Sequence, residues 1–511
     1  MKFLIPLNLL KIIEKLEAKK FEVFVVGGSV RDLLLKKQPN DWDLTTSAQP
    51  EDILAIFPNA KYKNDFGTVL IPEKYLEEKS IEKQKGFFEI TTYRKESQYR
   101  DKRRPDQVIF TDKLEDDLKR RDFTINALAI GIKGVDKLLK KSIKTEKISV
   151  ELEKSQIVLI DKYQGQEDLK NKLIKTVGSA KNRIEEDALR MMRAIRLAVQ
   201  LEFKIEAKTF QAIKDKAENL EYISQERIRD EFEKIILAEK PANGIELLIE
   251  TGLMKWIIPE LKETIKTEQN YHHYYGPYNT VYKHLMASLN KCPSKKLEVR
   301  LASFFHDIGK PETKQGRGYK SSFHNHEYAG ARITKKIMER LKFSREVIDK
   351  TVLLVKNHMF YYNVDEVGEA GVRKVIRKVG LENINDLIDV RVADRLGSGV
   401  PKAIPYKLRH FKYMVEKVSC DPISVKQLKI NGKDLMEKLK IKPGPQIGAI
   451  LEILLAEVIE NPKLNNFENL LNRAKGLIKK DLKVTKKEAK EKIKKIQKRE
   501  DQKIKKQYFV Q

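Results

Sequence analysis

The stretch that most constrains this chain is a short strand-like run followed by two glycines and, after a loop, by two closely spaced aspartates. The mostly apolar residues 21–26 precede Gly27 and Gly28, and SVRD then leads into a run of leucines. This order predicts a strand, a tight turn and the start of a helix. Glycines let the backbone approach a ligand closely, and a helix N-terminus offers free N–H groups. The turn is therefore suited to binding a triphosphate.

The aspartates on either side of Trp42 predict a metal site. If residues 42–44 form a strand, its period of two places Asp41 and Asp43 on one face. Two adjacent carboxylates repel each other unless cations lie between them. Oxygen ligands beside phosphates favour Mg²⁺. A glycine turn with two solvated aspartates would explain each half alone, but the combination at this spacing favours the metal site.

Two further segments carry side chains suited to a nucleotide. Glu89 lies in FFEITTYR, which predicts a strand, and from the sequence alone it fits a metal ligand or a solvent-facing residue equally well. In RRDFTINA we expect Arg120 and Arg121, with Asp122 and Asn126, at the start of an apolar helix. Arginine forks fit triphosphate oxygens and an asparagine can bind a ribose hydroxyl, although an Arg–Asp pair capping a helix would explain Asp122 alone.

The segment RIEEDALRMMRAIRL predicts a helix with a polar face above an apolar stripe. Asp187 and Arg190 are three residues apart and should share that face, with Arg193 and Arg196 following at the same spacing. A carboxylate beside a guanidinium can bind the edge of a base. Such pairs on surface helices are also common as simple salt bridges.

Most of the histidines lie between residues 272 and 394. Clustered imidazoles and carboxylates on converging helices are what a hydrolytic metal site requires. The candidates, in chain order, are His284, the adjacent His306 and Asp307, then His324, His326 and His358, and finally Asp394.

The motifs GGSVRD, DWD, RRDFTINA and EDALR resemble the signature of the tRNA nucleotidyltransferase / poly(A) polymerase family, whose bacterial members include CCA-adding enzymes. The resemblance covers about residues 20–260. It implies that Asp41 and Asp43, with Glu89 as a third carboxylate, hold two Mg²⁺ ions and catalyse nucleotidyl transfer. It further implies nucleotide binding by Gly27, Gly28, Ser29, Arg31, Asp32, Arg121, Asp122 and Asn126, and selection of CTP and ATP by Asp187 and Arg190 next to Arg193.

The order H…HD…D, with HDIGK around His306, resembles an HD phosphohydrolase domain. The resemblance implies a transition-metal site at His284, His306, Asp307 and Asp394. Such a domain is either active on phosphoesters, for example as a cyclic phosphodiesterase, or kept as a scaffold.

We therefore expect an α+β fold, with an N-terminal nucleotidyltransferase head containing a mixed β-sheet, then an all-α neck, an HD domain and a helical C-terminal region. Residues 1–20 should form a helix. The expected boundaries are 1–160 for the head, with a surface insertion at about 133–156, 161–265 for the neck, 270–415 for the HD domain, 416–474 for the helical C-terminal domain and 475–511 for a basic tail. We expect this tail to be a frayed helix or a disordered arm.

The formal net charge of +28 on 511 residues indicates a polyanionic partner, and residues 475–511 supply +10 of it. We expect this partner to be tRNA, with CTP and ATP as substrates. Two cysteines allow neither a disulfide framework nor a thiolate zinc site. No apolar run approaches the ~20 residues of a membrane span, so we expect no membrane partner and a cytoplasmic protein.

The expected activity is template-independent addition of CCA to the 3′ end of tRNA, with release of pyrophosphate. A poly(A) polymerase, or an enzyme that adds only A or only CC, would carry the same motifs. The basic loop with Arg103 and Arg104 favours complete CCA addition over CC addition. An alternative of another class is a metal-dependent HD phosphohydrolase whose head only binds RNA, but the intact DxD, RRD and EDxxR motifs argue against an inactive head.

Overall fold

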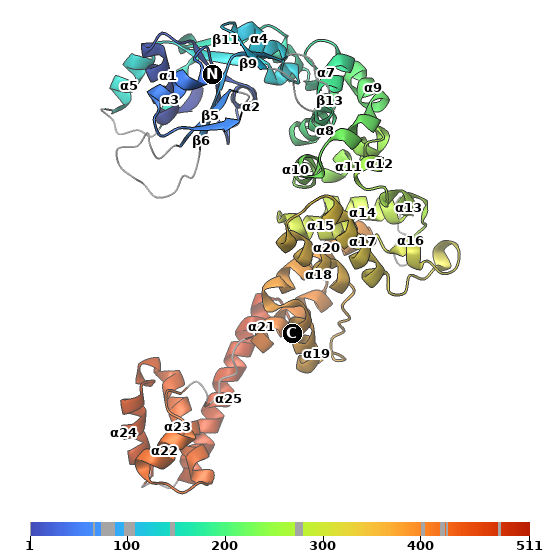
Figure 1. Cartoon of the computed structure of the whole chain (residues 1–511). Coiled ribbons are helices and arrows are strands. Elements are labelled where there is room, and N and C mark those ends of the chain that lie inside the picture. Colours follow the sequence, from blue (N-terminus) through green and yellow to red (C-terminus); the bar gives the residue numbers. More distant parts are fainter. Residues whose placement is uncertain are drawn as a thin grey trace.

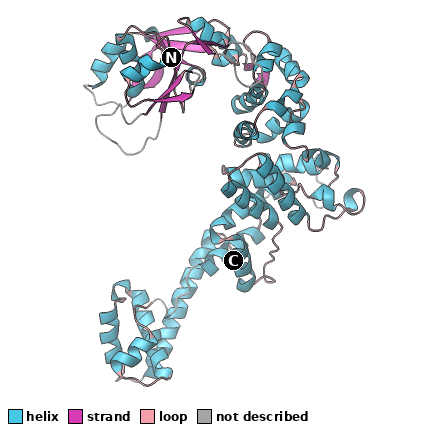
Figure 2. Cartoon of the chain, in the orientation of Figure 1, coloured by secondary structure: helices cyan, strands magenta, loops and turns pink. Residues whose placement is uncertain are grey.

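The computed structural model of the chain describes residues 2–64, 67–72, 87–96, 108–143, 149–270, 280–399, 404–419, 425, 428–478 and 482–510. The basic loop with Arg103 and Arg104 lies outside these residues. The described elements follow an arc, from the head through a helical neck and a middle group of helices to a C-terminal bundle (Figure 1). Strands are concentrated in the head and helices make up most of the remainder (Figure 2), which confirms the α+β class.

The head is built on a seven-stranded sheet in the order β11-β9-β2-β3-β6-β5-β4. Its strands are β2 (Val23–Val26), β3 (Asp43–Thr46), β4 (Lys61–Asn64), β5 (Thr68–Pro72), β6 (Phe87–Thr92), β9 (Leu128–Ile132) and β11 (Ile157–Asp161). β3 and β6 are parallel and the other neighbours are antiparallel. The sheet is therefore mixed, as predicted.

Helices and two small strand pairs complete the head. The helices are α1 (Leu7–Ala18), α2 (Gly28–Leu34), α3 (Pro50–Ile56), α4 (Leu114–Lys119) and α5 (Val135–Ile143). The additional strands are β1 (Lys2–Pro6), which pairs with β10 (Ser149–Glu153), and β7 (Arg94–Glu96), which pairs with β8 (Val108–Phe110).

The β1–β10 pair corrects two expectations. Residues 1–20 are not one helix, because Lys2–Pro6 form a strand before α1 begins. The segment at 133–156 is more than a surface excursion. Its helix α5 contacts α1, and Leu152, which pairs with Phe3 across the two strands, is fully buried. The alternation of Val150 and Leu152 with glutamates is the pattern of a strand with one buried face.

The neck is helical apart from the two-residue parallel pair of β12 (Leu173–Ile174) with β13 (Lys204–Ile205). Its helices are α6 (Gly165–Lys170), α7 (Ala180–Glu186), α8 (Leu189–Leu201), α9 (Ala207–Asp215), α10 (Gln225–Ile236), α11 (Pro241–Glu250), α12 (Met254–Ile257) and α13 (Leu261–Lys266). α8 packs against both α10 and α11.

The middle helices are α14 (Val281–Asn290), α15 (Leu297–Phe305), α16 (Lys310–Thr313), α17 (His326–Arg340), α18 (Arg345–Asn357), α19 (Glu369–Val379), α20 (Ile384–Gly397) and α21 (Tyr406–Ser419). α14, α15 and α20 contact one another, and α18 packs against α15, α17 and α20. This arrangement brings residues from distant parts of the sequence into one core.

The C-terminal bundle consists of α22 (Gly432–Leu439), α23 (Pro445–Glu460), α24 (Phe467–Leu477) and the first part of α25 (Leu482–Gln507). α25 runs from this bundle back to α21 (Figure 1). Ala489 is buried in the core of the bundle, whereas Val510, just after the helix, is buried in the core that includes α21. The expectation of a frayed or disordered tail is therefore wrong for the described residues 482–510, because apolar side chains at both ends of α25 have cores to enter.

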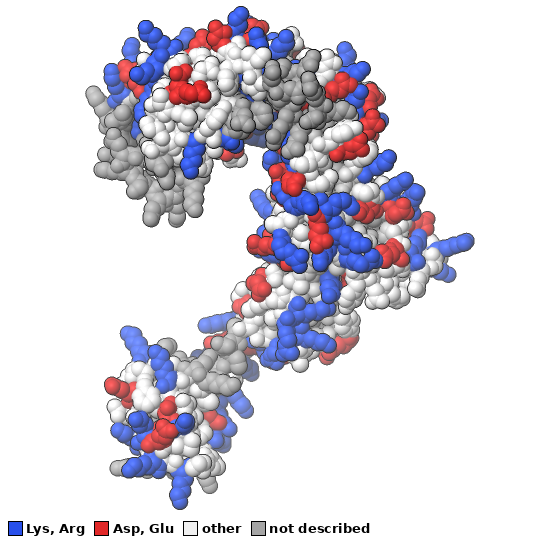
Figure 3. All heavy atoms as spheres, viewed as in Figure 1, with Lys and Arg blue, Asp and Glu red and all other residues white. Residues whose placement is uncertain are grey.

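Among the described residues, no helix has the length and apolar character needed to cross a bilayer. Lys and Arg side chains are abundant over the middle helices and the C-terminal bundle, with acidic residues interspersed (Figure 3).

Candidate functional site

Two of the predicted carboxylates of the head lie side by side on two parallel strands. Asp43 is the first residue of β3 and is paired in register with Glu89 of β6. Trp42 is buried in the core, while Asp41 is exposed. The predicted alternation therefore holds, and β3 itself begins only at Asp43.

Electrostatics at this carboxylate group favour a bound cation. Burial raises the pKa of Asp43, and Glu89 and Asp41 raise it further, whereas Arg121 lowers it. Glu89 is ion-paired with Lys63 of β4. Together the three carboxylates form an all-oxygen donor set, and such a set fits a hard divalent cation.

The glycine turn brings the backbone directly against this group. Gly27 has a positive φ of 75°, and a Cβ atom there would lie 2.8 Å from Nη1 of Arg121 and 3.7 Å from Oδ2 of Asp43. A larger residue would be strained and would displace Arg121. The predicted strand, glycine turn and helix are all present, with α2 starting at Gly28.

Ser29 connects the turn to the carboxylates. Its buried hydroxyl donates to the backbone oxygen of Asp41 at 3.2 Å and accepts the backbone N–H of Asp43 at 3.1 Å. A single side chain thus fixes the backbone on both sides of Trp42. This bridging position could not be deduced from the motif.

The RRDFTINA segment corrects a prediction about local structure. α4 ends at Lys119, a 3₁₀ turn spans Thr124–Asn126, and β9 begins at Leu128, so the motif lies in a connection and does not start a helix. The buried Phe123 and Ile125 anchor this connection in the core.

Polar contacts tie the same connection to the glycine turn. Arg31 donates through Nη1 to Oδ1 of Asn126 at 2.9 Å and through Nε to Oδ1 of Asp32 at 2.8 Å. Arg121 is ion-paired with the buried Asp117 at 3.3 Å. These contacts hold the guanidinium groups next to the turn.

Asp122 joins the head to the neck. Its Oδ1 accepts the N–H of Phe123 at 2.8 Å and Nδ2 of Asn126 at 3.2 Å, and its Oδ2 pairs with Arg193 of α8 at 2.6 Å. Burial would raise the pKa of Asp122, but Arg193 and then Arg190 outweigh it, so the pKa lies far below its usual value.

Asp187 and Arg190 do not share one continuous helix as predicted. α7 ends at Glu186, Asp187 has extended φ and ψ angles, and α8 begins at Leu189. The residues remain adjacent, since the N–H of Arg190 donates to the backbone oxygen of Asp187 at 3.0 Å. Periodicity alone could not detect this break, because the side-chain oxygen of Asp187 caps the new helix at Leu189.

Both side chains have protein partners. Arg190 is mostly buried and donates to Oε2 of Glu186 and, at 3.2 Å, to the backbone oxygen of Arg120. Asp187 accepts Nη2 of Arg227, on α10, at 3.2 Å. The neck residues are therefore linked to the RRD segment of the head.

Comparison with known proteins identifies the family to which this chain belongs. Residues 23–175 match a family model described as the poly A polymerase head domain, 202–265 match an RNA and SrmB- binding site of polymerase A, and 329–474 match tRNA nucleotidyltransferase domain 2. A CCA-adding enzyme of Lactococcus lactis subsp. lactis is 32% identical over 476 residues, which cover 91% of this chain and 96% of that protein. The chain belongs to the CCA-adding enzyme family.

Other members of the CCA-adding enzyme family are similar to this chain over most of its length. The enzyme of Ligilactobacillus salivarius is 32% identical over 92% of this chain and 96% of its own length. The structure of the Bacillus stearothermophilus CCA-adding enzyme in complex with CTP aligns over 92% of this chain and 98% of that chain, with 25% identity and a TM-score of 0.56.

A second polar cluster lies among the middle helices of this family member. Two groups of residues could each hold a metal ion, His284 with His306 and Asp307, and Asp307 with His326 and His358. All five are buried, and Asp307 belongs to both groups. The first segment of the cluster, 284–307, lies outside the three ranges that match family models.

Asp394 of α20 completes the first group. Its Oδ1 lies 3.3 Å from Nε2 of His284 and 3.8 Å from Nε2 of His306. The four residues predicted from the HD pattern are thus together. His326 and His358 were candidates from the sequence but lay outside the four-residue set that the HD resemblance implied, because only the fold brings α17 and the end of α18 against Asp307.

The histidine rings are oriented as metal ligands. The Nδ1 atoms of His306, His326 and His358 lie 2.9, 2.7 and 2.7 Å from the carbonyl oxygens of Ser303, Phe323 and Val355. Each ring therefore donates its Nδ1–H to a carbonyl and turns Nε2 towards the cluster, which is the usual support for a metal-binding histidine.

Distances between the ring nitrogens also fit an ion. Nε2 of His284 lies 3.0 Å from Nε2 of His306, and Nε2 of His326 lies 3.3 Å from Nε2 of His358. Ligands at ~2.0–2.1 Å from an ion are about 3 Å apart, so these spacings match shared coordination.

The protonation states of His358 and Asp307 agree with this geometry. Burial lowers the pKa of His358 to about 3, with His306 lowering it further, so this ring is neutral and able to bind a metal. Burial would raise the pKa of Asp307, but Lys310 and His306 hold it well below its usual value, so this residue is a carboxylate.

Proposed function

We propose that this chain completes the 3′ end of tRNA with CCA, taking CTP and ATP as substrates and using no nucleic-acid template. The observation that carries the proposal is the direct pairing of Asp43 with Glu89, next to Asp41 and the Gly27 turn, in a chain of the CCA-adding enzyme family. Relatives over most of the chain are named CCA-adding enzymes, which favours this activity over poly(A), A-only or CC-only addition.

Asp41, Asp43 and Glu89 would hold the divalent metal that nucleotidyl transfer needs, and we propose Mg²⁺ because all the donors are oxygens. Divalent ions supply charge stabilisation for the attacking 3′-hydroxyl and for the leaving pyrophosphate. The protein's own contribution is to hold three carboxylates in place, through the β3–β6 register and the Ser29 bridge.

The nucleotide would bind between the glycine turn and the RRD segment. Gly27 and Gly28 let the triphosphate approach the backbone, and Ser29, Arg31 and Asp32 shape this turn. Arg121, Asp122 and Asn126 form the opposite wall. In the neck, Asp187 and Arg190 would bind the base edge, with Arg193 fixing Asp122 between the two parts. The contacts among these residues support a pocket shared by head and neck.

A direct test uses a tRNA transcript that lacks its CCA end. With Mg²⁺, CTP and ATP, sequencing of the products should show C, C and A added in that order and then no further addition. Addition of A alone, of CC alone or of a poly(A) tail would contradict the proposal and assign one of the related activities.

We propose a second, hydrolytic site in the middle helices. Two buried groups of possible ligands that share Asp307 support binding of a transition metal by His284, His306, Asp307 and Asp394, joined by His326 and His358. Such an ion supplies Lewis acidity towards a phosphoester. Protein supplied with Ni²⁺, Mn²⁺ or Co²⁺ should retain metal and hydrolyse 2′,3′-cyclic nucleotides. His306→Ala should abolish this hydrolysis, while CCA addition persists. Metal-free protein with no hydrolysis would instead favour a scaffold.

A further inference from the structure

Two hollows meet at helix α20. One, the cluster cleft, has a volume of about 670 Å³ and is lined by members of the metal cluster, including Asp307, His326, His358 and Asp394. The other, the aromatic pocket, has a volume of about 570 Å³ and lies between α21 and the segment that follows α18. Both volumes are in the range of small-molecule sites.

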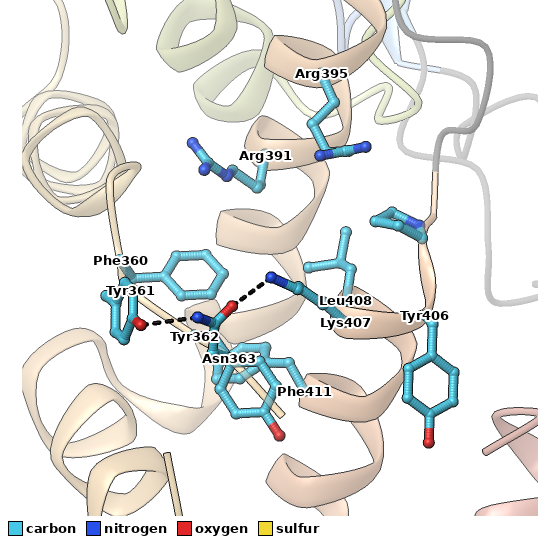
Figure 4. A pocket seen from close by; sticks show the side chains of 11 residues that line it. Phe360, Tyr361, Tyr362, Asn363, Arg391, Arg395, Tyr406, Lys407, Leu408 and Phe411 are labelled. Atoms are coloured by element: carbon cyan, nitrogen blue, oxygen red, sulfur yellow. Dashed lines mark hydrogen bonds between the residues drawn. The ribbon is translucent and has the colours of Figure 1, made fainter. Parts of the chain in front are cut away.

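Arg391 and Arg395 line both hollows. They are four residues apart on α20, so their side chains are neighbours on one helix face. Figure 4 shows both on α20, beside the aromatic residues of the pocket. Arg391 donates to Oδ2 of Asp394 at 2.9 Å. Within the described residues, Nε of Arg395 is buried and has no hydrogen-bond partner.

The cluster cleft is cationic beyond these arginines. Lys310 and Lys320 also line it, and Nζ of Lys310 lies 2.6 Å from Oδ2 of Asp307. Four cationic side chains around a buried carboxylate and imidazole cluster favour an anionic ligand, and guanidinium forks are suited to phosphate oxygens.

The aromatic pocket has a different character. Five of its lining residues are aromatic: Phe360, Tyr361, Tyr362, Tyr406 and Phe411. The rings of Phe360 and Phe411 are 4.8 Å apart, and those of Tyr362 and Phe411 are 5.0 Å apart in an edge-to-face arrangement. Tyr361 and Tyr406 are 65% and 39% exposed, so planar faces remain available to a ligand. Exposed aromatic side chains stack on nucleobases.

Polar groups in the pocket fit the edge of a base. Nδ2 of Asn363 donates to the hydroxyl of Tyr361 at 2.8 Å, and Nζ of Lys407 donates to its Oδ1 (Figure 4). Amide, hydroxyl and ammonium groups at one wall supply the donors and acceptors that a heterocycle needs.

The two hollows are also consecutive in the chain. His358 and Met359 line the cluster cleft, and Phe360 to Asn363 line the aromatic pocket. Tyr361 is the third residue after His358, so their Cα atoms are at most ~11 Å apart. We propose that the aromatic pocket is a nucleobase subsite of the cluster cleft, so that the ligand is a nucleoside phosphate with its phosphate at Arg391, Arg395 and the cluster and its base against the exposed rings of the aromatic pocket.

Binding of the nucleoside phosphate does not depend on the proposed hydrolytic activity. Only the later cleavage of its phosphate ester rests on that proposal. The ligand's chemistry is that of either a free mononucleotide or the 3′-terminal nucleotide of an RNA. The same stacking face and the same arginines would hold both.

The binding test uses the full-length protein in the absence of CTP, ATP and tRNA, so that no other nucleotide competes with the probe. A labelled nucleoside 3′-monophosphate and a short single-stranded RNA with a 3′-phosphate are titrated in parallel. Removing both stacking faces, in Tyr361→Ala/Tyr406→Ala, should weaken binding about 5- to 150-fold, the range measured for loss of base stacking. The matched control is Tyr328→Ala, which removes a 48% exposed tyrosine of α17 that lines neither hollow. An unchanged dissociation constant in the double variant would overturn the subsite, whereas the relative affinities of the two probes identify the source of the ligand.

A hydrolysis test separates the subsite from the chemistry. In metal-supplied protein, the double variant should raise KM for a nucleotide but leave hydrolysis of ribose 5-phosphate unchanged, because that ligand has no base. Arg395→Gln should weaken binding of both the nucleotide and ribose 5-phosphate, because each carries a phosphate. If the tyrosine variant impaired hydrolysis of the nucleotide and of ribose 5-phosphate equally, the base subsite would be contradicted. If nucleotide binding depends on the tyrosines but no metal supports hydrolysis, the hydrolytic proposal fails and the subsite stands.

Discussion

Several side chains in the head hold other site residues in position. Ser29 bridges the backbone of Asp41 and Asp43, and Asp122 is held by Arg193 from the neck. These contacts pre-organise charged groups before any ligand binds, which is the most effective way for a protein to stabilise developing charge.

Asp43→Asn tests the proposed metal site at the residue scale. The substitution keeps the size of the side chain and removes its charge, so we expect about a thousandfold slower incorporation of both CTP and ATP, since metal ligation supplies several kcal/mol. The measurement is primer-extension kinetics on tRNA lacking CCA. Asp136→Asn makes the same change at a 65% exposed carboxylate of the head and should be silent. ATP addition at the normal rate by the Asp43 variant would rule out its catalytic role.

Asp187 tests the choice of nucleotide. Asp187→Ala removes an acceptor proposed to bind the base edge, and loss of such a hydrogen bond costs ~1–3 kcal/mol, or about 5- to 150-fold in discrimination. We expect misincorporation of UTP and GTP to rise by this factor, measured by sequencing of single additions.

Arg227→Gln is the informative comparison for Asp187. It removes the ion pair seen at 3.2 Å but keeps the carboxylate. If both variants lose selectivity equally, the ion pair between the residues is needed and the carboxylate is not the reader of the base.

Secondary structure could be predicted from the sequence where it depends on residues that are close together in the chain. The strand and glycine turn before α2 and the alternation around Trp42 were confirmed because burial and backbone conformation depend there on neighbouring residues. The helix break at Asp187 and the strand Lys2–Pro6 were missed, since one depends on a side-chain cap and the other on a partner strand about 150 residues away. His326 and His358 were candidates but were left out of the implied four-residue ligand set for the same reason, because the convergence of α17 and α18 is tertiary.

Strand β10 gives a prediction at the element scale. Leu152 is fully buried, so Leu152→Ala should destabilise the head by about 2–5 kcal/mol through lost burial and a cavity. Glu151→Ala changes the adjacent exposed residue of the same strand and should remain within about 0.5 kcal/mol of the parent. Urea unfolding followed by loss of CTP incorporation measures both. Equal, small effects would show that the 133–156 segment does not stabilise the head.

At the scale of the whole molecule, α25 couples the C-terminal bundle to the middle helices. The hydroxyl of Tyr413, on α21, donates to Asp501, and Lys417 lies 3.7 Å from the same carboxylate. Deleting residues 479–511 would therefore remove packing from two cores as well as charge. A test of RNA binding must neutralise the charge and keep the helix.

The exposed lysines of α25 allow that test. Lys487, Lys494, Lys495 and Lys498 are exposed, and changing all four to Gln leaves the buried Ala489 and the bundle in place. Each phosphate contact contributes ~0.7–0.9 to the slope of log K against log salt, so we expect weaker tRNA binding and a slope flatter by up to about 3. Turnover at saturating tRNA should be unchanged, because α25 contributes no residue to either proposed metal site. A salt slope equal to that of the parent, in a variant with unchanged helix content, would place the RNA-binding surface on the neck and middle helices.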